Sequence, residues 1–131
     1  MSAVVTNTFA SLEGEQYIRL TTFRKSGKAV PTPVWFAESG GKLYVLTLAT
    51  SGKVKRLRHT PQVELAASDA RGNPHGETIL AQATIHSADS EMGKFANRTL
   101  TRKYGLMKRL FSLAQRMRGT TPVYLEISPR G

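Results

Sequence analysis

A cluster of positive charge follows a small-residue turn in the middle of the chain, and this segment is the best suited to chemistry. The segment 53–58 reads Lys-Val-Lys-Arg-Leu-Arg, and Thr50, Ser51 and Gly52 precede it. A turn of this kind leaves free backbone N–H groups where a helix begins. Free N–H groups beside the ammonium of Lys53 form a site for a phosphate or another anion. The alternative is a solvated basic helix face, and composition alone does not separate the two.

The single tryptophan marks a second candidate position. Trp35 follows prolines at positions 31 and 33. Proline donates no backbone hydrogen bond, so we expect this strand to be bulged or to lie at the edge of a sheet. Unpaired backbone there could meet the polar edge of a planar ring, with Trp35 as a wall beside that ring. The alternative is that Trp35 fills the core.

The sequence shows no catalytic constellation. His59, His75 and His86 are scattered and lack the spacing of zinc ligands, so we expect no metal site. The acidic residues form no paired motif, and no Gly-x-Ser-x-Gly elbow supports a nucleophile. Catalytic residues therefore stay unassigned. If the protein is an enzyme, a cofactor must carry the chemistry while the chain binds and orients it.

Composition indicates a small, strongly basic globular protein. The 131 residues suit one domain, 1–131, and 40% apolar with 21% charged residues is ordinary. The net charge of +10 predicts an anionic partner without identifying it. There is no cysteine, which excludes disulfide and thiol chemistry. We find neither a signal-peptide pattern nor an apolar run of roughly 18 residues, so we expect a cytoplasmic protein that does not bind membranes.

Apolar patterning predicts a mainly β (α+β) fold of six strands with peripheral helices. The strands are expected at 17–23, 29–37, 43–48, 63–67, 77–86 and 121–127. Short turns at 24–28 and 38–41 make neighbouring strands antiparallel, with Gly27 supplying a positive φ. A parallel sheet is disfavoured because no crossover helices separate the first three strands.

Helices are expected at three places. A short one is weakly signalled at 8–13, and the basic segment forms a second that Pro61 ends. After Ala88 the apolar spacing changes to every third or fourth residue, which predicts an amphipathic helix capped by Asp89 or Ser90. Gly105 is expected to divide this last segment into two helices.

These elements, in this order, resemble the pyridoxamine-phosphate-oxidase-like split-barrel superfamily. The resemblance lies in the hairpin 20–28, the Pro-Thr-Pro-Val-Trp-Phe segment 31–36, the strand 42–47, the basic segment 53–63 and the helix break 102–105. It covers nearly the whole chain. It is closest to the small actinobacterial branch thought to use the deazaflavin coenzyme F-420.

The resemblance implies a six-stranded, mostly antiparallel split β-barrel that forms a homodimer with cofactor sites at the subunit interface. It also implies which residues bind the cofactor. In this resemblance the cofactor phosphate would be bound by Thr50, Ser51, Gly52 and Lys53, with Lys55 and Arg56 next to them. The cofactor ring would lie along Pro33, Val34 and Trp35.

Three functions follow as hypotheses. The first is an oxidoreductase that transfers hydride to or from a small organic substrate with coenzyme F-420, or alternatively FMN. Pyridoxamine phosphate is not the expected substrate, because the chain stops soon after Ile127 without the oxidases' extra basic motifs. The second is a non-catalytic cofactor-binding protein on the same fold. The third, a basic nucleic-acid-binding β-barrel, is disfavoured because few strand aromatics interleave with basic residues.

Overall fold

The computed structural model describes residues 5–6, 8–105 and 121–130 of the chain. The strands are β1 (Val5–Thr6), β2 (Tyr17–Phe23), β3 (Ala29–Trp35), β4 (Ala37–Ser39), β5 (Lys42–Leu48), β6 (Gln62–Ser68), β7 (Thr78–Ser87) and β8 (Pro122–Pro129). The helices are the 3₁₀ turn η1 (Ala10–Leu12), α1 (Gly52–His59) and α2 (Glu91–Tyr104).

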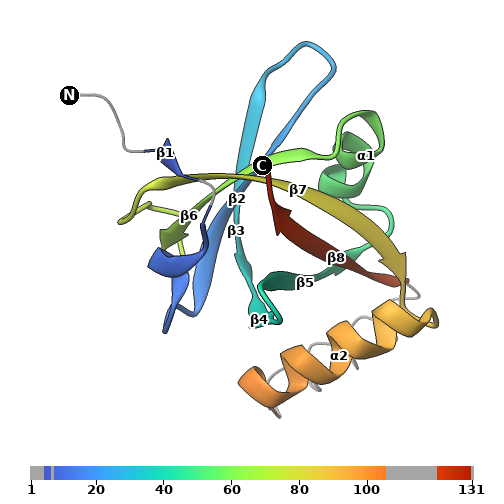
Figure 1. Ribbon diagram of the computed structural model, residues 1–131. Helices are drawn as coiled ribbons and strands as arrows, with labels where there is room; N and C mark the ends of the chain where they lie inside the picture. Colours follow the sequence, from blue (N-terminus) through green and yellow to red (C-terminus); the bar gives the residue numbers. More distant parts are fainter. Residues whose placement is uncertain (1–4, 7, 106–120, 131) are drawn as a thin grey trace.

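The strands form one curled sheet in the order β3-β2-β6-β7-β8-β5-β4, with every neighbouring pair antiparallel. Among the strands that the structure describes, only β1, which pairs with β7 outside this path, runs parallel to its neighbour. The sheet curls into a barrel whose open side lies between the two end strands, and α2 crosses below β4, β5 and β8 (Figure 1). The mainly β, mostly antiparallel split barrel is confirmed, as is the edge position of β3.

The predicted number of strands was wrong: the described residues form eight, not six. The expected strand 29–37 is broken at Phe36 because the end of α2 binds both of its backbone groups. The Phe36 N–H donates to the Tyr104 hydroxyl at 3.0 Å, and the Phe36 carbonyl accepts from that hydroxyl at 2.6 Å. The second extra strand, β1, has only two residues, too few to show a period. The helix expected at 8–13 is a single 3₁₀ turn.

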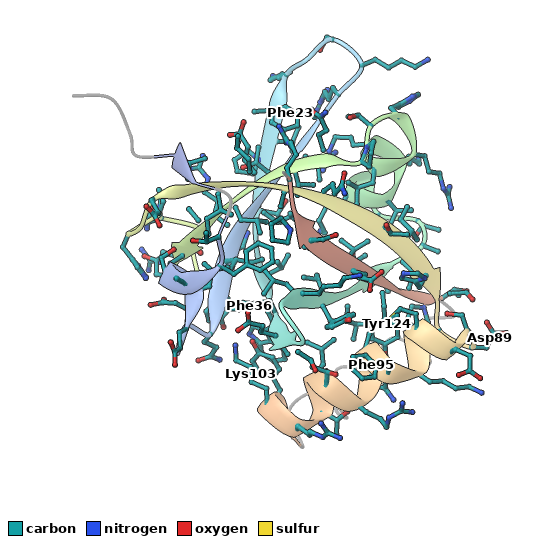
Figure 2. All side chains as sticks on the ribbon, in the orientation of Figure 1. Phe23, Phe36, Asp89, Phe95, Lys103 and Tyr124 are labelled. Atoms are coloured by element: carbon teal, nitrogen blue, oxygen red, sulfur yellow. The ribbon has the colours of Figure 1, made fainter. Side chains whose placement is uncertain are left out.

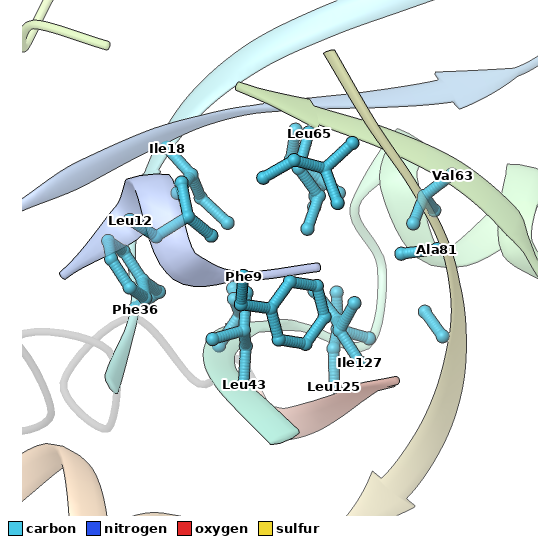
Figure 3. Packing of buried hydrophobic residues seen from close by; sticks show 14 of the residues in the cluster. Phe9, Leu12, Ile18, Phe36, Leu43, Val63, Leu65, Ala81, Leu125 and Ile127 are labelled. Atoms are coloured by element: carbon cyan, nitrogen blue, oxygen red, sulfur yellow. The ribbon is translucent and has the colours of Figure 1, made fainter. Parts of the chain in front are cut away.

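Alternation along the strands directs one side chain in two into the barrel. The buried core comprises Phe9, Leu12, Ile18, Leu20, Phe36, Leu43, Val45, Leu57, Val63, Leu65, Ala67, Ile79, Ala81, Ala83, Leu125 and Ile127. In Figure 3, Phe9 and Leu12 from the N-terminal turn lie among side chains of opposite strands. Burying each large aliphatic side chain contributes about 1.5–3 kcal/mol, so this core holds the split barrel together.

Helix α2 packs on the outside of the sheet. Ser90 caps it, accepting a hydrogen bond from the Gly93 N–H at 3.0 Å, and Gly105 ends it with a φ of 58°. Its buried face places Ala96 and Leu100 against Ala37, Tyr44 and Tyr124, and Figure 2 shows Phe95 and Tyr124 at this contact. The cap at Ser90 and the end of the helix at Gly105 are confirmed. The second helix that the sequence predicted falls outside the described residues.

Candidate functional site

A cleft of about 350 Å³ opens where the barrel is split. It is lined by Tyr17, Pro33, Val34, Trp35, Leu46, Thr47, Leu48, Ser51, Lys53, Leu100 and Tyr104. Strand β3 forms one wall, β5 and the start of α1 form another, and α2 contributes two side chains. Apolar walls with a few polar groups at one end are typical of cofactor and small-molecule sites.

The start of α1 supplies the polar end of the cleft. Ser51 caps the helix, its hydroxyl accepting from the Val54 N–H at 3.4 Å and lying 3.3 Å from the Thr47 hydroxyl. Val54 and Leu57 are buried and anchor the helix to the barrel. Helix geometry leaves the first-turn N–H groups of Gly52 and Lys53 without intrahelical partners. These donors and the positive end of the helix dipole favour an anion at this place.

Lys53 is half-buried and lines the cleft. Its ammonium has no hydrogen bond or ion pair with any residue that the structure describes. Burial lowers the pKa of Lys53, and the nearby charge of Arg56 lowers it further. An unpaired, partly desolvated ammonium is unfavourable until an anion meets it, so this side chain indicates an anion-binding site.

The Arg56 guanidinium folds back towards the start of its own helix. A Cβ placed on Gly52 would lie only 2.7 Å from its Nη1 atom, and its Nε donates to the hydroxyl of the fully buried Thr22 at 2.6 Å. Burial and then the charge of Arg24 lower the pKa of Arg56. Arg56 therefore lies beside the helix start, and not farther along the helix where the sequence had placed it. Arg24, on the hairpin that joins β2 to β3, is an additional cation that sequence reasoning missed.

The structure brings together five of the nine residues predicted to bind cofactor. Pro33, Val34, Trp35, Ser51 and Lys53 line the cleft, whereas Thr50, Gly52, Lys55 and Arg56 do not. Thr50 is exposed in the turn, and Lys55 is exposed on the outer face of α1. Gly52 is exposed at the helix start, with the Arg56 guanidinium beside it.

Aromatic rings form the opposite end of the cleft. Trp35 and Tyr104 are stacked, with 4.8 Å between ring centroids and 9° between planes, and Tyr17 lies 6.5 Å from Trp35. The Gln16 carbonyl also lies 2.8 Å from the Tyr104 hydroxyl, whose single proton it shares with the Phe36 carbonyl. Burial raises the pKa of Tyr104 to about 12. The phenol therefore stays neutral near pH 7, and backbone groups occupy its hydroxyl.

Lys103 fixes the same end of α2 from the outside. Its ammonium donates to the carbonyls of Glu15 at 2.6 Å and Phe36 at 2.8 Å, and it lies 3.8 Å from the Phe36 ring centroid. Figure 2 shows Lys103 and Phe36 side by side. Burial lowers the pKa of Lys103. These contacts of Lys103 hold the end of α2, and with it Tyr104, beside the cleft.

Sequence reasoning missed the cleft residues Tyr17, Leu46, Thr47, Leu48, Leu100 and Tyr104. Leu46 and Leu48 belong to a continuous apolar run. Such a run does not show which of its side chains face the core and which face the cleft on the other side of β5. Leu100 and Tyr104 fitted the apolar face of a helix and gave no sign of a ligand site. A period-2 count through β5 would have separated Leu46 and Leu48 from the core positions Val45 and Leu43.

The described residues contain no cluster of three metal-ligating side chains and no helix that could span a membrane. Two of the histidines contact acids: the His75 ring lies 2.8 Å from Glu15, and the His86 ring 3.1 Å from Glu126. His59 is exposed at the end of α1. None of the three lines the cleft.

The mostly antiparallel split barrel is the fold of the pyridoxamine-phosphate-oxidase-like split-barrel proteins. The family model described as pyridoxamine 5'-phosphate oxidase matches residues 6–130, so the chain belongs to this family. A search of curated proteins finds no match.

Three solved structures show how widely this fold is used. The heme storage protein HutZ from Vibrio cholerae is 16% identical, with a TM-score of 0.72 over 93% of this chain and 87% of HutZ. A protein described as an F-420 reductase is 20% identical, with a TM-score of 0.63 over 95% of this chain and 94% of that one. An FMN-binding protein from Nostoc punctiforme is 17% identical, with a TM-score of 0.58 over 92% and 73%. At these identities the similarity shows the fold alone.

Proposed function

We propose that this protein is an oxidoreductase that uses the deazaflavin coenzyme F-420 to transfer hydride to or from a small organic substrate, with FMN as the alternative cofactor. The observation that carries the proposal is the Lys53 ammonium at the start of α1, which has no partner among the described residues. Lys53 lines the same apolar cleft as Trp35. Similarity in fold to an F-420 reductase and an FMN-binding protein supports it.

The residues present fit a phosphorylated ring cofactor. Ser51, Lys53 and the first-turn N–H groups of α1 would hold the phosphate, with Arg56 beside them. Trp35 and the apolar side chain of Leu46 would enclose the ring. When bound, the deazaflavin supplies the hydride-transferring ring carbon. The chain's own contribution is to align the two reactants and exclude water.

Charge favours the deazaflavin over FMN. Coenzyme F-420 carries a poly-glutamate tail in addition to its phosphate, and the chain has a net charge of +10. Lys55 is exposed on α1 beyond the phosphate position, where it could meet that tail. We therefore expect Lys55→Ala to weaken F-420 binding by about 0.2–1 kcal/mol and to leave FMN binding unchanged. Salt should reduce this difference, because exposed charges are screened over about 8–10 Å.

We further propose that the protein is a homodimer whose cofactor sites lie at the subunit interface. The cleft lies at the open side of the barrel, where a second subunit could cover it. Closed two-fold dimers are also the commonest soluble oligomers. Light scattering at micromolar concentration should report twice the mass of the chain, and a monomer would count against the shared site.

A non-catalytic cofactor-binding protein is the second candidate. Among the described residues that line the cleft, only Tyr17, Lys53 and Tyr104 can ionise, and backbone groups occupy the Tyr104 hydroxyl. No carboxylate or histidine of the described residues therefore lines the cleft as an acid or base. Similarity in fold to a heme storage protein agrees with this candidate.

Nucleic-acid binding receives less support from the strand aromatics. Phe36 and Tyr44 are buried, and Tyr17 and Trp35 line the cleft. They therefore form no exposed row on which successive bases could stack.

A fluorescence titration with both cofactors tests the proposal. Coenzyme F-420 and FMN are added separately to the purified protein, and their affinities are compared at low and moderate salt. Tighter binding of F-420 supports the deazaflavin, and tighter binding of FMN supports the alternative. Binding of nucleic acid with a steep salt dependence, and of neither cofactor, would overturn the oxidoreductase proposal.

A further inference from the structure

A second hollow, of about 190 Å³, lies beside the cleft. Strands β2 and β3 and the loop after β6, which presents Arg71 at an exposed position, line this open hollow, and Pro33 lines both the hollow and the cleft. The prolines at positions 31, 33 and 74 form apolar walls, and the charged side chains of the lining are Arg19 and Arg71. The hollow is therefore a basic recess that is separated from a ligand in the cleft by Pro33.

Neither arginine of this recess has an acidic partner among the residues that the structure describes. Arg19 is half-buried on the outer face of β2, opposite Pro33 on one side and Ala66 on the other. Within the described residues, neither the Arg19 nor the Arg71 guanidinium forms a hydrogen bond or an ion pair. Glu64 lies on the same face of the sheet, opposite Thr21, and makes no ion pair with either.

The loop that carries Arg71 is held in place by its own hydrogen bonds. The Asp69 carboxylate accepts from the N–H groups of Arg71 at 2.9 Å and Asn73 at 3.0 Å, and from the Asn73 side chain at 3.0 Å. These bonds, those from Asn73 first, lower the pKa of Asp69. Asp69 organises the loop and does not line the recess.

Gly72 brings this loop close to β3. Its φ is +88°, which disfavours other residues, and an added Cβ would lie 3.3 Å from the Pro33 Cδ. The loop thus contacts the strand that also forms a wall of the cleft. The backbone of both arginines is therefore fixed, that of Arg19 by strand β2 and that of Arg71 by the hydrogen bonds of the loop.

Two unpaired guanidinium groups lining one recess with apolar walls are suited to a carboxylate, which arginine binds through two parallel hydrogen bonds. We propose that the substrate is an organic acid, whose carboxylate binds at Arg19 and Arg71 while its reacting part lies in the cleft beyond Pro33. This inference rests on the proposed oxidoreductase function and names its substrate class.

Binding of benzoate and its neutral analogue benzamide tests the carboxylate site. Each is titrated into the full chain while the backbone amide signals of Arg71 and Gly72 are followed by NMR. Benzoate should bind more tightly than benzamide. Arg19→Gln/Arg71→Gln should weaken benzoate about tenfold or more, as expected for loss of charge-assisted hydrogen bonds, and should leave benzamide unchanged.

The matched control is Arg98→Gln/Arg102→Gln, which also removes two charges, from exposed positions of α2. It should change benzoate affinity less than about twofold, in line with the small effects of exposed charges. Equal affinity of benzoate for wild type and Arg19→Gln/Arg71→Gln, or equal binding of benzoate and benzamide, would overturn the proposal.

The variant Arg19→Gln/Arg71→Gln also tests whether the carboxylate that binds in the recess belongs to a substrate or to the glutamate tail of the cofactor. Unchanged affinity for both FMN and F-420 supports the substrate, because their phosphate is expected at α1. A loss for F-420 alone would assign the recess to the glutamate tail and overturn the organic-acid substrate. If wild type binds neither cofactor, the proposed function fails, whereas the benzoate result still tests the recess.

Discussion

The indole of Trp35 lies parallel to the phenol of Tyr104, with 4.8 Å between the ring centroids. Trp35 ends β3 and Tyr104 ends α2. The Tyr104 hydroxyl binds both backbone groups of Phe36, the next residue after β3. One side chain thus interrupts the edge strand and forms a wall of the cleft, so the break in the strand and the shape of the site have a common cause.

Tyr104→Phe should keep the stacked ring and destabilise the fold. The variant removes the acceptor of the Phe36 N–H, and an unsatisfied buried donor costs about 1–3 kcal/mol. Urea unfolding can be followed by the fluorescence of Trp35, the single tryptophan, which the retained ring should leave similar in the native state. An unchanged unfolding midpoint would show that these hydrogen bonds do not stabilise the strand end.

Lys53→Ala should weaken binding of either cofactor by about 1.5–3 kcal/mol, the range for a hydrogen bond to a charged group. Lys94→Ala is the matched control, because Lys94 is exposed on α2 and does not line the cleft. Affinities come from the fluorescence titration, and circular dichroism checks the fold. Equal affinities for wild type and Lys53→Ala would remove Lys53 from the phosphate site.

Cofactor affinity should also fall at alkaline pH. Burial lowers the pKa of Lys53 below its ordinary 10.5, and a bound phosphate favours the charged ammonium. Binding should therefore be strongest below the lowered pKa and decline as pH rises through it, sooner than an ordinary lysine would predict. The Lys53→Ala variant should lack this decline, and an identical decline in the variant would assign it to another group.

Local patterns predicted much of the fold. Period-2 alternation located β7, Gly27 formed the expected positive-φ turn, and Ser51 and Ser90 cap the helices that begin there. Each of these depends on residues close in sequence. The break at Phe36 could not be predicted in this way, because its cause is Tyr104, 68 residues away.

The candidate site was predicted in part for the same reason. The helix start at Ser51 and the proline-rich edge strand have local signals, and both reach the cleft. The position of Arg56 has no such signal, because its guanidinium depends on Thr22 in β2 and on the space beside Gly52. The recess at Arg19 needs a loop some 50 residues later in the chain.

Gly52→Ala should weaken cofactor binding without destabilising the fold. The new Cβ would displace the Arg56 guanidinium, which is the end of a flexible side chain, and alanine favours the helix over glycine. We expect a loss of about 0.5–1.5 kcal/mol in affinity, comparable to one hydrogen bond. A double-mutant cycle with Arg56→Ala gives the check: the double variant should bind no more weakly than Arg56→Ala alone. Full additivity would mean that Gly52→Ala acts on the cofactor directly.

Glu126→Gln should destabilise the barrel at neutral pH. Glu126 lies on β8 and is 9% exposed, with the Lys42 ammonium at 3.3 Å and the His86 ring at 3.1 Å from its carboxylate oxygens. Burial by itself raises the pKa of Glu126, but the hydrogen bonds and charges of His86 and Lys42 outweigh it, so the pKa lies below its ordinary 4.5. Losing charge-assisted hydrogen bonds of this kind costs about 1.5–3 kcal/mol.

The pH dependence of this loss follows from the direction of the shift. Because the folded carboxyl has the lower pKa, the unfolded chain binds more protons at acid pH, and stability falls there. The contribution of Glu126 is fully present above its unfolded value, near 4.5, and is lost as pH falls through the lower folded value. Urea unfolding should therefore show a gap between wild type and Glu126→Gln at pH 7 that narrows below pH 4.5. Glu13→Gln, at an exposed position, should match wild type throughout. A gap that stays constant down to acid pH would show that the carboxylate charge is not what stabilises the contact of β8 with β5 and β7.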